Sequence, residues 1–146
     1  MTIRRLSVTL MWGWVTFLAS ACAHTWNAHE FRSVDDIIRS AAILEGHSVS
    51  VRGYLRFGDE SKNLWSNRDA YLAVRSRYVA PTDPKWNRCI TLYDLDGWRA
   101  KLRSSNDRYV VIAGVLRRYP TLPGEINFDS CSDLGVSIQS VELAPR

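Results

Sequence analysis

The chain carries the same alternating pattern of apolar residues twice. Residues 49–56 (VSVRGYLR) and 110–117 (VVIAGVLR) both follow V-x-[VI]-x-G-x-L-R. Apolar residues at every second position predict a strand with one buried face. Gly53 and Gly114 occupy the same place in the two copies, where a strand can bend or bulge because no side chain projects. The pattern therefore predicts two bent strands of a small closed barrel.

Capping residues and helical spacing of apolar positions predict a helix before the first strand. Ser33 is placed to cap it, acidic residues occupy its first turn, and Gly46 follows its end. The helix is expected over residues 34–44, with an apolar stripe at Val34, Ile37, Ile38, Ala41 and Leu44. This stripe should lie against the barrel or close one end of it.

Five strands are expected in all. They cover His47–Phe57, Leu64–Ser66, Cys89–Tyr93, Tyr109–Arg118 and Val136–Leu143. In the last strand the apolar residues change from even to odd positions after Ile138, which predicts a bulge near Ser140. Residues 71–74 are read as a further extended piece, and Asp96–Arg103 as a short helix capped by Asp96.

The fourth strand also has apolar residues on its outward side. Val111, Ala113 and Val115 alternate with the inward positions, so another element should cover that face. The N-terminal helix is the expected cover.

This order of elements resembles the OB-fold, the oligonucleotide/oligosaccharide-binding barrel. The resemblance rests on the helix between strands 3 and 4 and on the glycines of strands 1 and 4, and it covers Leu44–Leu143. It implies a mainly β protein: a five-stranded Greek-key barrel with an added N-terminal helix. The opening G-x-x-V-x-V-x-G-x-L at residues 46–55 is similar to small exported bacterial OB-fold proteins, many of them lipoproteins.

The first 22 residues read as a secretory signal. Arg4 and Arg5 precede an apolar run of about 13 residues, which is short of the roughly 20 needed to span a bilayer. Residues 23–32 are expected to be a tether and 33–146 a single domain. Removing the signal lowers the basic count from 19 to 17 against 15 acidic residues, so the mature protein carries only about +2. That is the ordinary solubility margin of a small domain.

Cys22 ends a segment that resembles the lipobox of bacterial lipoproteins. The leucine, Leu18, lies four positions before the cysteine where the usual pattern has three. One alternative is an acyl anchor on Cys22, which would hold a periplasmic protein on the outer membrane. The other is cleavage by a general signal peptidase after Ala21 or Ala23. Either way, export leaves Cys89 and Cys131 as an even pair in an oxidising compartment, where we expect a disulfide.

No arrangement of residues nominates a catalytic site. His24, His29 and His47 lack the spacing of zinc ligands. There is no G-x-S-x-G, no phosphate-binding glycine loop and no free cysteine if the pair forms. The prediction is a protein that is not an enzyme and has no cofactor or metal.

Aromatic and arginine residues point to binding instead. In OB-folds, ligands meet the face of strands 2 and 3 and the neighbouring loops. The candidates at these positions are Trp65, Tyr71, Arg75, Arg77, Trp86, Tyr93, Arg117, Arg118 and Tyr119. Such residues stack on sugar rings or bases and bond their polar groups. The alternative is that Trp65, Trp86 and Trp98 are core or lid residues and that the arginines form an ordinary solvated face.

The hypothesis is a non-enzymatic binding or interaction module of the bacterial cell envelope, with a glycan or a protein as its partner. The alternative is a structural or assembly component of an envelope complex. Export makes nucleic acid an unlikely partner, and an enzyme with a site built from loops is the least favoured reading.

Overall fold

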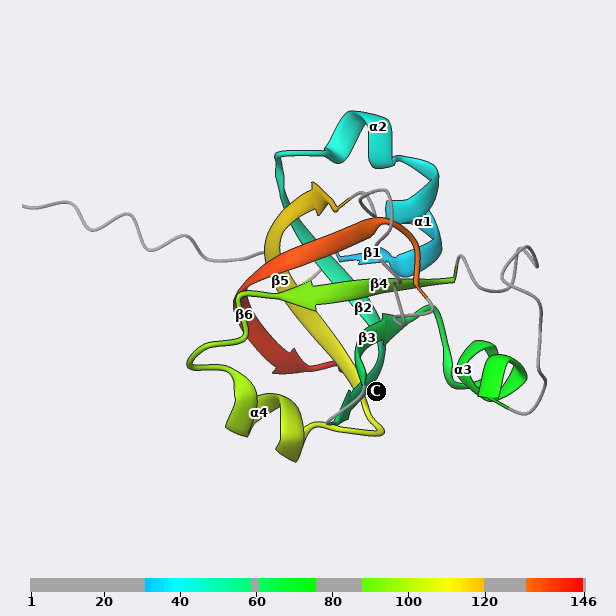
Figure 1. The fold of residues 1–146 in the computed structure, drawn as a ribbon, viewed down its shortest axis with the longest axis vertical. Coiled ribbons are helices and arrows are strands. Elements are labelled where there is room, and N and C mark those ends of the chain that lie inside the picture. The colour runs from blue at the N-terminus through cyan, green and yellow to red at the C-terminus, as the bar shows by residue number, and fades with distance from the viewer. Residues whose placement is uncertain (1–30, 59–60, 76–87, 120–130, 146) are drawn as a thin grey trace, which may run out of the picture.

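A computed structural model describes residues 31–58, 61–75, 88–119 and 131–145 (Figure 1). This part of the chain forms one mixed sheet of six strands with four short helices. In chain order the elements are β1 Arg32–Ser33, α1 Val34–Arg39, α2 Ala41–Leu44, β2 Ser48–Gly58, β3 Ser61–Trp65, α3 Arg68–Arg75, β4 Cys89–Tyr93, α4 Arg99–Ser104, β5 Tyr109–Arg118 and β6 Leu134–Leu143. The protein is therefore mainly β, as predicted.

Five of the strands close into a ring. The sheet runs β1-β2-β3-β4-β6-β5, and a further pairing of β2 with β5 joins its ends. β4 and β6 are parallel, whereas the other neighbours in the ring are antiparallel. The long β2 makes closure feasible, because its first part pairs with β5 and its second part pairs with β3.

Gly53 and Gly114 lie where neighbouring groups approach the backbone too closely for a side chain. A Cβ at Gly114 would lie 2.0 Å from the carbonyl oxygen of Ser137, and one at Gly53 would lie 2.6 Å from Cγ of Leu64. The predicted bulge in β6 is also present, since Ala113 pairs with Ser140 and Gly114 with Ile138, which leaves Gln139 unpaired.

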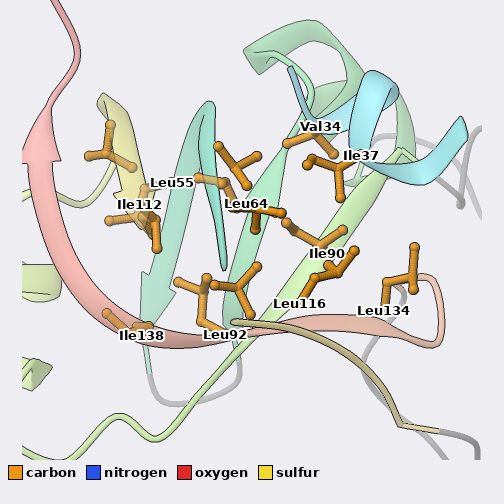
Figure 2. Close-up of a cluster of buried hydrophobic side chains, with 14 of the residues drawn as sticks. Val34, Ile37, Leu55, Leu64, Ile90, Leu92, Ile112, Leu116, Leu134 and Ile138 are labelled. Atoms are coloured by element: carbon orange, nitrogen blue, oxygen red, sulfur yellow. The ribbon is translucent and has the colours of Figure 1, made fainter. Parts of the chain in front are cut away.

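The inward residues of the ring form one apolar core. Leu55, Leu64, Ile90, Ile112 and Leu116 are fully buried within it. Figure 2 shows Val34 and Ile37 of α1 reaching into the same cluster. α4 adds the buried Leu102, and in Figure 1 α2 lies above the strands, α1 beside their upper part and α4 below them.

The N-terminal helix begins as predicted but ends early. Ser33 forms a capping box, in which its hydroxyl accepts from the backbone N–H of Asp36 and the Asp36 carboxylate accepts from Ser33. α1 stops at Arg39, and Ser40 separates it from α2, so the single helix expected over residues 34–44 is wrong.

The prediction that the N-terminal helix covers the outward face of β5 is also wrong. α1 packs chiefly against β1, β2 and β4, because burying Val34 and Ile37 in the interior removes more apolar surface from water than lying across β5. Arg32, the last residue of the predicted tether, instead pairs with Val51 as part of β1.

Two further local predictions need correction. Residues 71–74 belong to helix α3 and not to an extended piece. The side chain of Asn67 accepts a hydrogen bond from the backbone N–H of Ala70 at 2.7 Å, which starts this helix. Asp96 does not cap α4, whose N-terminal flank is Trp98 with no side-chain capping bond.

The predicted disulfide is confirmed. Cys89, the first residue of β4, is bonded to Cys131, which shortly precedes β6, across a sequence separation of 42. The bond fixes the entry points of two parallel neighbours in the ring.

Candidate binding surface

The structure divides the predicted binding residues into two groups. Trp65, Tyr71 and Arg75 lie on β3 and α3, whereas Tyr93, Arg117, Arg118 and Tyr119 lie at the ends of β4 and β5. Arg77 and Trp86 lie outside the described residues. No described contact joins the two groups.

Trp65 is buried and so cannot serve as an exposed stacking platform. Its exposure is 3%, and it packs in a satellite cluster with Tyr54, Ala70 and Cys89. The sequence could not separate a core tryptophan from a surface one, because α3 is the element that covers it. Its ring contacts that of Tyr71 edge-on at a centroid distance of 5.6 Å.

A set of tyrosines and arginines gathers around α3 on the outer side of β2. We call it the tyrosine–arginine cluster. It consists of Tyr54, Tyr71, Tyr109, Arg52, Arg56, Arg68, Arg75 and Asp107. Only Tyr71 and Arg75 were among the predicted binding residues. The alternation of β2 marks Arg52, Tyr54 and Arg56 as outward positions, but nothing in the sequence shows what they meet.

Tyr54 lies at the centre of the cluster. Its ring is 6.1 Å from that of Tyr71 and 5.6 Å from that of Tyr109, in tilted arrangements typical of aromatic pairs. Its hydroxyl donates to Asp107 Oδ1 at 2.8 Å. The hydroxyl of Tyr109 accepts from the backbone N–H of Arg68 at 3.3 Å, which ties the start of α3 to β5.

The arginines surround these rings. The guanidinium of Arg56 lies 4.6 Å from the ring centroid of Tyr71 and is ion-paired with Asp107. Arg75 donates to the hydroxyl of Tyr71 at 3.1 Å. Arg52 lies 5.5 Å from the centroid of Tyr109. These are cation–π and hydrogen-bond contacts that hold the side chains in place while leaving positive charge at the surface.

The ionisable groups of the cluster perturb one another. The hydrogen bond from Arg56, followed by that from Tyr54, lowers the pKa of Asp107. Burial and the bond to Asp107 raise the pKa of Tyr54. Burial opposes the charge of Arg56, but its bond with Asp107 raises its pKa overall. At neutral pH the cluster thus holds a charged Arg56–Asp107 pair beside a neutral phenol.

The second group is built around two stacked tyrosines. The rings of Tyr93 and Tyr119 are 3.7 Å apart and nearly parallel, and Nζ of Lys62 lies 5.4 Å from the centroid of Tyr93. Arg118 is ion-paired with Asp133 and with Glu45. Because two carboxylates already face Arg118, this group offers less positive charge to a ligand than the tyrosine–arginine cluster.

The described residues provide neither a metal site nor a membrane-spanning helix. They contain no group of three or more His, Cys, Asp and Glu side chains placed to hold a metal ion. No helix in this part of the chain has the length and apolar character needed to cross a membrane.

No family model and no curated protein matches the chain. Solved structures that resemble it include two OBodies, each bound to hen egg-white lysozyme. One is 13% identical over 78% of this chain and 93% of its own, with a TM-score of 0.45. The other is 14% identical over 77% of this chain and 90% of its own, with a TM-score of 0.46.

Proposed function

We propose that the protein is a non-enzymatic binding module of the bacterial cell envelope, built on an OB-fold-like Greek-key barrel. The strand order of the closed ring, its one parallel pair and the position of α4 between β4 and β5 support this assignment of the fold. A glycan is the favoured ligand.

The tyrosine–arginine cluster is the observation that carries the proposal. Tyr71 and Tyr109 keep part of their rings in solvent, and aromatic faces stack on the apolar faces of sugar rings. Arg68 and Arg75 are exposed beside them and can donate to sugar oxygens. Preorganised side chains lower the entropic cost of binding.

The envelope location rests on the N-terminal sequence. The signal and the lipobox-like segment ending at Cys22 support export to the periplasm, with an acyl anchor to the outer membrane as one outcome. The Cys89–Cys131 disulfide suits such an oxidising compartment. Mass spectrometry of the mature N-terminus distinguishes an acylated Cys22 from an unmodified start at Cys22 or His24.

A glycan array tests the binding proposal. Wild type should bind a defined set of glycans, and Arg75→Gln and Tyr71→Ala should weaken that binding. Arg103→Gln removes an exposed arginine from α4 and is the matched control, which should bind as wild type does. Trp65→Ala is unsuitable, because truncating a buried tryptophan costs about 3–5 kcal/mol of stability.

The alternative is an assembly component that docks on a protein. Exposed apolar side chains at the start of β5 and the end of β6 favour it, since Tyr109 and Leu143 are 39% and 45% exposed. A pull-down from envelope extracts, run beside the array, separates the two. Capture of one protein that is unaffected by Arg75→Gln, together with an empty array, would replace the glycan proposal with this one.

A further inference from the structure

The tyrosine–arginine cluster contains more hydrogen-bond donors than acceptors. Four arginines contribute guanidinium groups, which only donate. Asp107 is the one carboxylate in direct contact with them among the described residues, and both of its oxygens are in use. Oδ1 accepts from Tyr54 and Arg56, and Oδ2 accepts from Asn106 at 3.3 Å.

Asp107 leaves two buried donors of the cluster without a hydrogen-bond partner. Nε of Arg52 and Nε of Arg56 are buried and have no hydrogen-bond partner. Buried donors without partners cost free energy, and native structures contain few of them. The two residues flank Tyr54 on the same side of β2, so the unmet capacity lies at the centre of the cluster.

The positive charge of the cluster is also only partly compensated, because one carboxylate, Asp107, faces four arginines. In the part of the chain that the structure describes, Arg52, Arg68 and Arg75 form no ion pair with a carboxylate. Arg68 and Arg75 are exposed at the two ends of α3, seven residues apart, so they share one side of the helix. Asp69, the single acid of α3, leaves the helix with a net positive charge.

We infer that the ligand of this surface is an acidic glycan, and that the cluster binds the oxyanion of one of its sugars, a uronate, sulfate or phosphate group. This inference rests on the proposed glycan-binding function. An oxyanion only accepts hydrogen bonds and carries negative charge, and Asp107 alone supplies too little of either for four guanidinium groups. Arg68 and Arg75 make the first electrostatic contact, and the partly exposed ring of Tyr71 packs against the sugar.

The test is an array of uronic, sulfated and phosphorylated oligosaccharides, each printed beside its neutral parent, followed by calorimetric titration of the strongest pair. For the uronic member, the parent is the methyl ester of the same oligosaccharide. Wild type should bind an acidic member at least about tenfold more tightly than its parent, and increasing salt should weaken the binding. The double variant Arg68→Gln/Arg75→Gln should lose most of that preference.

A second double variant controls for net charge. Arg99→Gln/Arg103→Gln removes the same two charges from α4, where both residues are exposed, and should keep the preference. Equal binding of acidic and neutral members overturns the inference and leaves the glycan-binding function standing. Binding to no glycan overturns both. If both double variants lose the preference for acidic glycans equally, the oxyanion site is not this cluster, because the loss would reflect net charge alone.

Discussion

Replacing Gly114 with alanine tests how the ring closes. The new methyl group would lie 2.0 Å from the carbonyl oxygen of Ser137 and 2.7 Å from Cγ1 of Val136. Real carbon–oxygen contacts are far longer, so β5 and β6 must separate at the bulge. The oxygen belongs to the backbone of the adjacent strand and cannot rotate away as the end of a flexible side chain can.

We expect a loss of about 3 kcal/mol in the free energy of unfolding, the upper end of the usual cost of overpacking. That is a large share of the roughly 5–15 kcal/mol that stabilises a domain of this size. Urea unfolding of the oxidised protein, followed by tryptophan fluorescence and far-UV circular dichroism, measures this loss. Both probes should report the same midpoint if unfolding is two-state.

Gly58 provides the matched control. Gly58 is the last residue of β2, another strand of the ring, but a Cβ there would have no atom within 4 Å. Gly58→Ala should leave stability within about 0.5 kcal/mol of wild type. Unfolding of Gly114→Ala and Gly58→Ala at the same urea concentration would contradict the close approach of β5 and β6 at Gly114.

Three further predictions concern stability. Because the pKa of Asp107 lies below its ordinary value of 3.8, its ionised form stabilises the fold above that pH, and this contribution is lost as the pH falls through the lowered pKa. Thermal unfolding of Asp107→Asn should therefore change less on acidification below 3.8 than that of wild type, and parallel curves would contradict this. Reduction of Cys89–Cys131, with its separation of 42 residues, should cost about 4 kcal/mol, and an unchanged urea midpoint under reductant would contradict the estimate. Ser33→Ala should cost about 1 kcal/mol of stability through the lost cap, while Ser33→Thr should retain most of the stability that the cap provides. Equal urea midpoints for the two variants would argue against the capping box.

The sequence predicted those parts of the fold that depend on local patterns. Alternation located β2, β4 and β5, a change of parity located the bulge in β6, and Ser33 located the start of α1. Each of these signals lies within a few residues of the structure that it specifies.

The sequence could not predict how the elements meet. Residues 71–74 are apolar enough to pass for a strand, and the helix depends on Asn67 and on packing over Trp65. The apolar stripe of α1 was correctly identified, but its packing against β1, β2 and β4 follows from the closed ring. The cluster was largely missed for the same reason: Arg56 and Asp107, for example, are 51 residues apart in the chain.

Hydrogen exchange is the most direct test of the central claim that the tyrosine–arginine cluster is the binding surface. The protein would be compared by mass spectrometry with and without the glycan that binds most tightly on the array. Exchange should slow in the peptide covering α3 and in the turn around Asp107, while the peptide covering α4 should not change. Protection confined to the peptides around Tyr93 and Tyr119, with α3 unaffected, would contradict the account.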